Sequence, residues 1–360
     1  MDSSGVDDAS KSLMPQQFAS DNNAGMCPEA LTAFVRANAD GHVTAYGDDP
    51  WTDKARAHLS ELFETEARVF FVFNGTAANA LALAQICAPY HAVIAHAFSH
   101  IEEDEAGAPG LFSGGAKIVT ADTPLAKLTP DVVDALARKG RGVHHVKPRA
   151  LSITQATELG TVYTPDEVGA LCATARKHEL RVHMDGARFA NAIATLQCTP
   201  AQLSWRAGVD VLCFGGVKNG LAVGEVVLFF DQQLATEFEW RVKQAGHLNS
   251  KMRLMTAPWL ALLENGIWLR NAHHANAMAA RLSKHITNLP GVRLIAPVQS
   301  NGVFVELSPP LQTALRAKGW RFYTFLGDSG CRLMCAWDTT PETVDRFAAD
   351  LAQASVSRDR

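Results

Sequence analysis

The stretch VDVLCFGGVKNGLAVGEVVLFF, residues 209–230, places one lysine between two apolar runs. Each run is short, uninterrupted and rich in Val, Leu and Phe, which is typical of a strand buried on both faces of a sheet. Lys218 lies between the runs, with Gly215 and Gly216 before it and Gly220 after it. A solvated lysine does not need such permissive backbone, whereas a lysine that a ligand approaches closely does.

Further short apolar runs precede this stretch, and helical patterns separate them. The runs are residues 68–75, 91–96, 116–121, 150–154 and 181–186. Two of the intervening helices have clear start signals, because Thr129 is followed by Pro130, and Thr164 is followed three residues later by Glu167. Strands that alternate with helices predict an α/β fold with a mostly parallel sheet covered on both faces.

The pattern changes near residue 255. A long helical stretch, 255–286, is followed by the strand-like runs VRLIAP, NGVFVEL, RFYTFL and CRLMCAW with helices between them. We therefore expect a large domain over residues 17–255 and a smaller C-terminal α+β domain over 256–360. Residues 1–16 are polar and acidic, without the basic start and apolar core of a signal peptide, so a disordered tail is expected there.

The composition argues against several classes of protein. Of the 360 residues, 47% are hydrophobic and 19% are charged, which allows a large core. The formal net charge is −4 and Lys and Arg do not cluster, so nucleic acid is a poor candidate partner. No apolar window of about 18 residues predicts a membrane span. The seven cysteines are scattered, which favours reduced thiols in a cytoplasmic protein, and no ligand pattern predicts a metal site.

Chemically active residues follow the predicted strands. In open α/β sheets, ligands bind beyond the carboxyl ends of the strands. Asn74, Gly75 and Thr76 follow residues 68–73 of the first run and open a helix, whose free N–H groups favour an anion. The later strand ends are followed by His100 and Glu105, by Gln155 and Glu158, by Asp185 and Arg188, and by Lys218. Each feature alone has a simpler interpretation, such as a plain turn or a surface ion pair between Asp185 and Arg188.

Taken in order, these residues match the needs of pyridoxal 5′-phosphate. The aldehyde of this cofactor needs a lysine amine for a Schiff base, which Lys218 supplies. Its pyridine nitrogen needs a carboxylate such as Asp185. Its phosphate needs backbone donors at a helix start, here Gly75 and Thr76, and its ring needs a flat partner such as His100. The sequence therefore predicts a pyridoxal-phosphate site.

The sequence also resembles the low-specificity L-threonine aldolases, which are fold-type I pyridoxal-phosphate enzymes, from about residue 17 to residue 350. The resemblance is carried by FASDNNAGMCPEAL, YGDDPWT, FNGTAANALAL, SHIEEDEAGA, HMDGARFANA, GGVKNG and CRLMCAWDTT. HMDGAR followed by the lysine is the most specific pair, and YGDDP favours the aldolases over generic relatives. The resemblance implies a seven-stranded, mostly parallel sheet. It also implies reversible cleavage of L-threonine, L-allo-threonine and related L-β-hydroxy-α-amino acids, phenylserine included, to glycine and an aldehyde.

Roles for single residues follow from this resemblance. Lys218 would bind the cofactor covalently, Asp185 would pair with the pyridine nitrogen, and Arg188 would hydrogen-bond the 3′-oxygen of the cofactor. His100 would stack on the ring, and it is the first candidate for the base that removes the proton of the β-hydroxyl group, directly or through a water.

The substrate carboxylate and the subunit arrangement also follow from the resemblance. Ser20 and Arg332 would bind the carboxylate. In this family a dimer completes each site, so we expect a homodimer or homotetramer with shared sites. Tyr46 and a basic residue, Lys251 with Arg241 as the second choice, would come from the neighbouring subunit.

One stretch, SITQATELG, departs from the family pattern. Many threonine aldolases carry a histidine after the strand that we place at 150–154, and here Gln155 is near the expected position. Glu158 either takes over part of the role of that histidine or has a structural role.

Other functions share parts of this pattern. A β-eliminating lyase or a transaminase of the same fold type needs the same lysine, aspartate and phosphate turn. A non-catalytic cofactor-binding protein would not need His100 or Arg332. The glycines around Lys218 do not follow a nucleotide-binding pattern. The sequence does not determine the preferred aldehyde, the configuration at Cβ, or the choice between dimer and tetramer.

Overall fold

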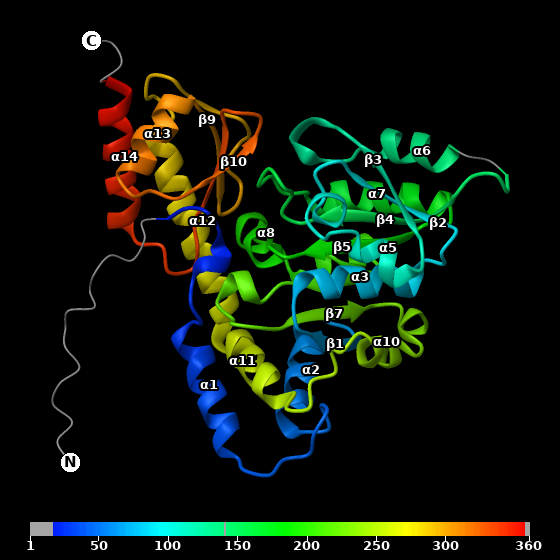
Figure 1. Ribbon diagram of the computed structural model, residues 1–360. Helices are drawn as coiled ribbons and strands as arrows, with labels where there is room; N and C mark the ends of the chain where they lie inside the picture. The colour runs from blue at the N-terminus through cyan, green and yellow to red at the C-terminus, as the bar shows by residue number, and fades with distance from the viewer. Residues whose placement is uncertain (1–16, 140–141, 357–360) are drawn as a thin grey trace, which may run out of the picture.

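The computed structural model describes residues 17–139 and 142–356. It contains two sheets, which lie in separate parts of the molecule (Figure 1). The larger sheet has seven strands in the order β1-β7-β6-β5-β4-β2-β3, and the smaller has four strands in the order β10-β11-β9-β8. The tail expected over residues 1–16 lies outside the described residues.

The larger sheet confirms the predicted architecture. Its strands are β1 (Arg68–Val72), β2 (His91–His96), β3 (Lys117–Ala121), β4 (Lys147–Thr154), β5 (Arg181–Gly186), β6 (Val211–Phe214) and β7 (Glu225–Phe229). Only β7 runs antiparallel to its neighbours, β1 and β6. Each strand overlaps one of the apolar runs identified in the sequence, so the mostly parallel α/β sheet is confirmed.

Helices cover both faces of this sheet, because its side chains alternate between two apolar cores. Phe71 and Leu212 face the core that includes residues of α7, α8 and α11. Their chain neighbours Val72 and Cys213 face the opposite core, with residues of α3 and α10. The helices up to the small sheet are α1 (Pro28–Ala39), α2 (Pro50–Leu62), α3 (Gly75–Ile86), α4 (His100–Glu103), α5 (Ala108–Ser113), α6 (Pro130–Arg138), α7 (Pro165–Lys177), α8 (Phe189–Leu196), α9 (Pro200–Leu203), α10 (Phe238–Gln244), α11 (Arg253–Leu263) and α12 (Ile267–Ile286).

Both predicted helix starts are confirmed. The Thr129 side chain caps α6 by accepting a hydrogen bond from the Val132 N–H. Thr164 and Glu167 form the expected capping box at the start of α7. These local signals need no tertiary contact, since each satisfies backbone groups within one turn.

The small sheet forms its own core. Its strands are β8 (Val292–Leu294), β9 (Gly302–Leu307), β10 (Tyr323–Leu326) and β11 (Gly330–Met334), and α12, α13 (Pro309–Ala317) and α14 (Pro341–Val356) pack with it. Phe18 belongs to this core, where its ring centroid is 5.8 Å from that of Trp320. The start of the described chain is therefore fixed to the small sheet, and it leads from there to Ser20 and Asp21. The domain boundary near residue 255 stays a prediction.

The helical stretch expected over 255–286 is not one helix. α11 ends at Leu263 and α12 begins at Ile267. Between them, Asn265 and Gly266 have φ values of 55° and 68°. Asn-Gly is a turn signal, and left-handed backbone at these two residues redirects the chain where the apolar pattern alone predicted continuity.

Close packing explains the glycines beside Lys218. A Cβ atom at Gly215 would lie 2.5 Å from the carbonyl oxygen of Ala187, and one at Gly216 would lie 2.4 Å from the Trp259 ring. We interpreted these glycines in the sequence as room for a ligand. The structure gives a different reason, because their Cα atoms are in contact with the turn after β5 and with a core tryptophan.

This packing predicts that Gly215→Ala lowers the free energy of unfolding by about 1–3 kcal/mol, the usual cost of overpacking. Gly25→Ala is the matched control, because a Cβ there has no atom within 4 Å. Urea denaturation of both variants and the wild type measures the effect. Equal free energies of unfolding for the two variants would contradict this, because they would show that the turn after β5 moves to accept the added Cβ without loss of stability.

Candidate active site

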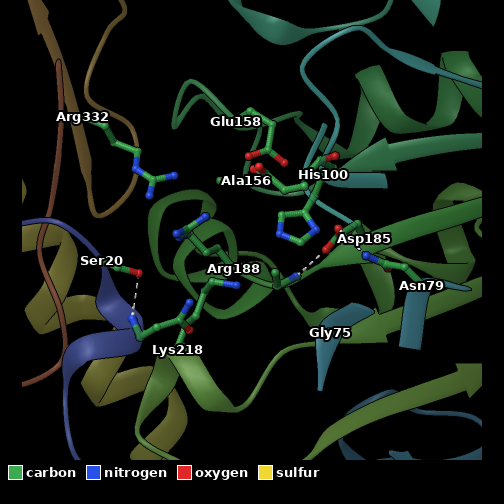
Figure 2. A pocket seen from close by; sticks show the side chains of 14 residues that line it. Ser20, Gly75, Asn79, His100, Ala156, Glu158, Asp185, Arg188, Lys218 and Arg332 are labelled. Carbon is green, nitrogen blue, oxygen red and sulfur yellow. Dashed lines mark hydrogen bonds between the residues drawn. The ribbon is translucent and has the colours of Figure 1, made fainter. Parts of the chain in front are cut away.

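A cavity lies at the carboxyl ends of the parallel strands (Figure 2). Its empty volume, which includes space open to solvent, is ≈ 660 Å³. The lining residues are Ser20, Asn22, Gly75, Asn79, His100, Asp104, Thr154, Ala156, Glu158, Asp185, Ala187, Arg188, Lys218 and Arg332. Thus the large sheet, the N-terminal segment and strand β11 of the small sheet all contribute to one cavity.

Most of the predicted site residues line this cavity. They are Ser20, Gly75, His100, Asp185, Arg188, Lys218 and Arg332. Thr76 follows Gly75 in the first turn of α3, although its side chain is not part of the lining.

Tyr46 and Lys251 lie elsewhere, in a shared surface cluster. The Tyr46 N–H donates to the Ser250 carbonyl at 3.1 Å, next to Lys251. The Lys243 Nζ is 4.9 Å from the centroid of the Tyr46 ring. Tyr46 is 49% exposed. Within one chain, these residues are therefore separate from the cavity and available to a neighbouring molecule.

Asp185 ends β5 and is almost completely buried. Its Oδ1 accepts from the Ala187 N–H at 2.9 Å, and its Oδ2 accepts from the Asn79 Nδ2 at 2.8 Å. Burial by itself raises the pKa of this carboxyl. The charge of His100 and the Ala187 N–H outweigh that effect and leave the pKa below its usual range. Asp185 is thus held ionised, with a fixed orientation.

His100 is held by a second carboxylate. Its Nδ1 is 2.8 Å from the Glu105 Oε1, which also accepts from the Asn79 Nδ2 at 2.8 Å. Burial lowers the pKa of the imidazole, but the hydrogen bond with Glu105 and the negative charge of Asp185 outweigh burial and raise the pKa above its ordinary value. Asn79 therefore links the two carboxylates. The sequence interpretation missed it, although it is a buried asparagine in the mostly apolar helix α3.

Arg188 has a different partner from the one considered in the sequence. Its Nε and Nη2 donate to the two oxygens of Asp21 at 2.7 and 2.9 Å. Asn301 Nδ2 donates to Asp21 as well, at 2.9 Å. Burial raises the pKa of Asp21, but the Arg188 guanidinium outweighs burial and lowers it. The surface ion pair between Asp185 and Arg188 is therefore not formed, and Asp21 is a site residue that sequence interpretation missed.

Arg332 reaches the cavity from β11 of the small sheet. Its Nη2 donates weakly to the Ala19 carbonyl at 3.4 Å, and its buried Nε has no hydrogen-bond partner among the described residues. Burial, together with the charge of Arg188, lowers the pKa of Arg332. Ser20 lies nearby, with its Oγ accepting from the Asn22 N–H at 3.1 Å. An anionic ligand would accept a hydrogen bond from the unpartnered Nε of Arg332 and balance the charge of its guanidinium.

Lys218 lies in the short turn η5 (Val217–Asn219) that follows β6. Among residues 17–139 and 142–356, its ammonium has no ion-pair partner. Glu225 is buried beneath the turn and accepts from the Gly216 N–H at 2.5 Å. Burial raises the pKa of Glu225 to about 7. Glu225 fixes the turn that carries the lysine, and the sequence interpretation did not identify it.

The side chains present fit pyridoxal 5′-phosphate. The N–H groups of Gly75 and Thr76 belong to the first turn of α3, which leaves them without partners inside the helix. A Cβ at Gly75 would meet nothing within 4 Å, so there is room for a phosphate beside it. The buried Oδ1 of Asn79 and Nε of Arg332 lack partners. With Lys218 free and Asp185 ionised, the donor and acceptor set matches that cofactor.

In the described part of the chain, no three His, Cys, Asp or Glu side chains gather where they could hold a metal ion. None of the helices in that same part is long and apolar enough to cross a membrane.

Gln155, near the position where the family histidine was expected, is a structural residue. It is completely buried, its Nε2 donates to the Tyr163 carbonyl at 2.7 Å, and its Oε1 accepts from the Tyr163 N–H at 3.0 Å. Glu158, three residues later, does line the cavity.

Residues 17–309 match the model of the beta-eliminating lyase family, whose members use pyridoxal 5′-phosphate. The fold, the cavity and this match together define a fold-type I pyridoxal-phosphate enzyme.

Relatives make the assignment more specific. A low specificity L-threonine aldolase from Pseudomonas sp. (strain NCIMB 10558) is 56% identical over 336 residues, which is 93% of this chain and 97% of the relative. The enzyme of that name from Pseudomonas aeruginosa is 55% identical with the same coverage. The structure of Leishmania major threonine aldolase has a TM-score of 0.88 at 31% identity and covers 94% of this chain and 98% of its own. The chain therefore belongs to the low-specificity L-threonine aldolases within the beta-eliminating lyase family.

The Glu105–His100 contact predicts a measurable titration. Because its pKa is raised, His100 contributes stability that is fully present below its ordinary pKa of about 6.5 and is lost as the pH rises through the raised pKa. Glu105→Gln should lower the pKa of His100, as measured by NMR of the imidazole signals. His91, at the start of β2, serves as the internal control and should titrate unchanged. A His100 pKa that is the same in both proteins would contradict the role of Glu105.

Proposed function

We propose that this chain cleaves L-threonine, L-allo-threonine and related L-β-hydroxy-α-amino acids to glycine and an aldehyde, reversibly. The observation that carries the proposal is the convergence of Lys218, ionised Asp185 and Arg332 on one cavity. Arg332 comes from the small sheet, whereas Lys218 and Asp185 follow strands of the large one. A small amino acid can therefore contact both groups of residues at once.

Bound pyridoxal phosphate supplies an aldehyde that captures amino groups and a ring that withdraws electrons from Cα. The chain would hold it through Lys218, through the first-turn N–H groups of Gly75 and Thr76, and through Asp185 at the pyridine nitrogen. Asn79 and the Ala187 N–H orient the Asp185 carboxylate, so its charge is in place before the ligand arrives. His100 would stack on the ring, with Glu105 holding the imidazole in position.

The substrate carboxylate would bind to Arg332 and Ser20. Arg332 is supported by the rings of Tyr323 and Phe325, whose centroids lie 5.2 and 5.8 Å from its Cζ. Arg188 is paired with Asp21, and it would donate its remaining N–H groups to the 3′-oxygen of the cofactor without leaving this counter-ion.

We propose further that two subunits share each site, in a homodimer or homotetramer. The surface cluster of Tyr46, Lys243 and Lys251 lies outside the cavity of its own chain. In a twofold assembly, such a cluster can complete the partner's cavity while the partner completes this one. A cytoplasmic location is proposed as well, since all seven cysteines are free thiols.

Replacement of the lysine tests the core of the proposal. Lys218→Ala should abolish the visible absorbance of covalently held cofactor and all aldehyde release from L-threonine, because no other amine is expected to take its place. Lys177→Ala, at an exposed position in α7, is the control. An active Lys218→Ala enzyme would refute the assignment.

The reaction class is tested with the wild-type protein. Incubation with L-threonine and with L-phenylserine should release glycine and an aldehyde without a keto-acid acceptor. Ammonia and a keto acid would instead indicate a β-eliminating lyase, and a requirement for an acceptor would indicate a transaminase.

The charge of Asp185 is expected to control the rate. Asp185→Asn keeps the size of the side chain but removes the negative charge, so turnover should fall by at least about 100-fold, in line with the loss of a preorganised electrostatic group. Unchanged kcat would contradict the electronic role of this residue.

Shared sites are tested by mixing inactive chains. Lys251→Ala alone should weaken cofactor binding and activity. If Lys251 acts in the partner's site, mixed dimers of Lys218→Ala and Lys251→Ala chains contain one intact site, so random pairing restores about a quarter of the sites. If Lys251 acts in its own chain, an equal mixture has no intact site, and its activity is only that of the half of its sites that carry Lys251→Ala.

A further inference from the structure

Two carboxylates of the cavity lining, Glu158 and Asp104, have no hydrogen bond or ion pair among the described residues, but Asp104 is exposed and Glu158 is partly enclosed. In this Glu158 differs from Asp185 in the same lining and from Glu105 behind His100. Asp185 is hydrogen-bonded to Asn79 and Ala187, and Glu105 to His100. The Glu158 carboxylate makes no hydrogen bond and no ion pair with any residue that the structure describes. A partly enclosed carboxylate without a protein partner is costly, which makes it a candidate for ligand contact.

The backbone that carries Glu158 is held firmly. The Thr157 N–H donates to the Thr161 carbonyl at 2.8 Å, and the Gly160 N–H donates to the Thr157 carbonyl at 2.8 Å. Thr161 Oγ1 donates to the Leu125 carbonyl at 2.8 Å, and Ser300 Oγ donates to the Gly160 carbonyl at 2.9 Å. The loop therefore holds the backbone at Glu158 in place without using its carboxylate.

The surroundings of Glu158 suit a proton acceptor. Figure 2 shows its carboxylate on the cavity wall, on the side away from Lys218, with His100 and Arg332 on either side of it. Burial and the charge of Asp185 raise the pKa of Glu158, while Arg188, His100 and Lys218 act in the opposite direction. A carboxylate that is more basic than usual accepts protons more readily.

His100 is less suited to that task. Its Nδ1 is engaged by Glu105, and its raised pKa favours the doubly protonated ring, which donates hydrogen bonds and has no free lone pair. His100, the first candidate for the base in the sequence, is therefore shifted toward the form that stacks and donates.

Given the proposed aldolase function, on which this step rests, we propose that Glu158 binds the β-hydroxyl group of the substrate and accepts its proton. The O–H bond breaks and its proton moves to a carboxylate oxygen of Glu158. The released electron pair forms the C=O bond of the aldehyde. The Cα–Cβ bond breaks with its electron pair left at Cα, where a proton later adds to give glycine.

Ligand binding provides the first test, with a readout that is independent of turnover. The holoenzyme is titrated with L-serine and with L-alanine, which differ only in the β-hydroxyl group, and binding is followed spectrally before turnover. Glu158→Ala should reduce the preference for L-serine by about tenfold, the effect of losing a hydrogen bond to a charged group. The affinity for L-alanine and for the cofactor should stay within about twofold. An unchanged preference would overturn the proposal.

Kinetics provides the second test. Glu158→Gln, which keeps size and hydrogen-bonding capacity, should lower kcat for L-threonine by about 100-fold or more, whereas Glu158→Asp should retain more activity than Glu158→Gln. Glu342→Gln, at an exposed position in α14, is the control. Asp104→Asn tests the rival carboxylate, which lines the cavity but is exposed. Normal kcat in Glu158→Gln, or a larger loss in Asp104→Asn, would overturn the assignment.

Different results would refute the aldolase function and the role of Glu158. A wild-type protein that releases no aldehyde from L-threonine would refute the aldolase function and this step with it. An active wild type with equally active Glu158→Gln refutes only the role of Glu158.

Discussion

The close approach of backbone at the ends of β5 and β6 is the constraint on which the site depends. Gly215 packs so tightly against Ala187 that a Cβ would lie 2.5 Å from its carbonyl oxygen. This contact brings the turn after Asp185 against the turn before Lys218. Glu225 then fixes the lysine turn from below by accepting the Gly216 N–H. Because Gly215 has no side chain, the end of β6 can lie directly against the turn after β5. The carboxylate of Asp185 and the amine of Lys218 can therefore line the same cavity.

The charges around the cavity form two groups. Asp21 is paired with Arg188, and Glu105 with His100. The attraction within each pair offsets part of the free energy that it costs to bury these charges, and the pairs hold the cavity wall in position. Lys218, Glu158 and Arg332, like Asp185 and the exposed Asp104, have no ion-pair partner among the described residues, and all five line the same cavity. We infer that the paired charges position the wall, while the unpaired ones, Asp104 apart, act on the cofactor and the substrate.

Much of the fold was predictable from local patterns in the sequence. The apolar runs gave the seven strands of the large sheet, because strands buried on both faces are continuously apolar. The Thr129 and Thr164 caps were predictable because they act within one turn. The break at Asn265 and Gly266 was missed, since the apolar pattern continues across it. Asp21 and Asn79 were missed because their partners lie far away in the sequence, and Glu225 because it lies within an apolar run.

The sequence by itself determined the class of fold, the cofactor and the residues at the strand ends, because alternating strands and helices place those residues at one edge of a sheet. Only the tertiary structure decided which of them have partners. It paired Arg188 with Asp21 and buried Gln155 against Tyr163, while Glu158 stayed unpaired at the cavity wall. The physical reason is that pairing depends on distances between segments remote in the chain, which no local pattern contains.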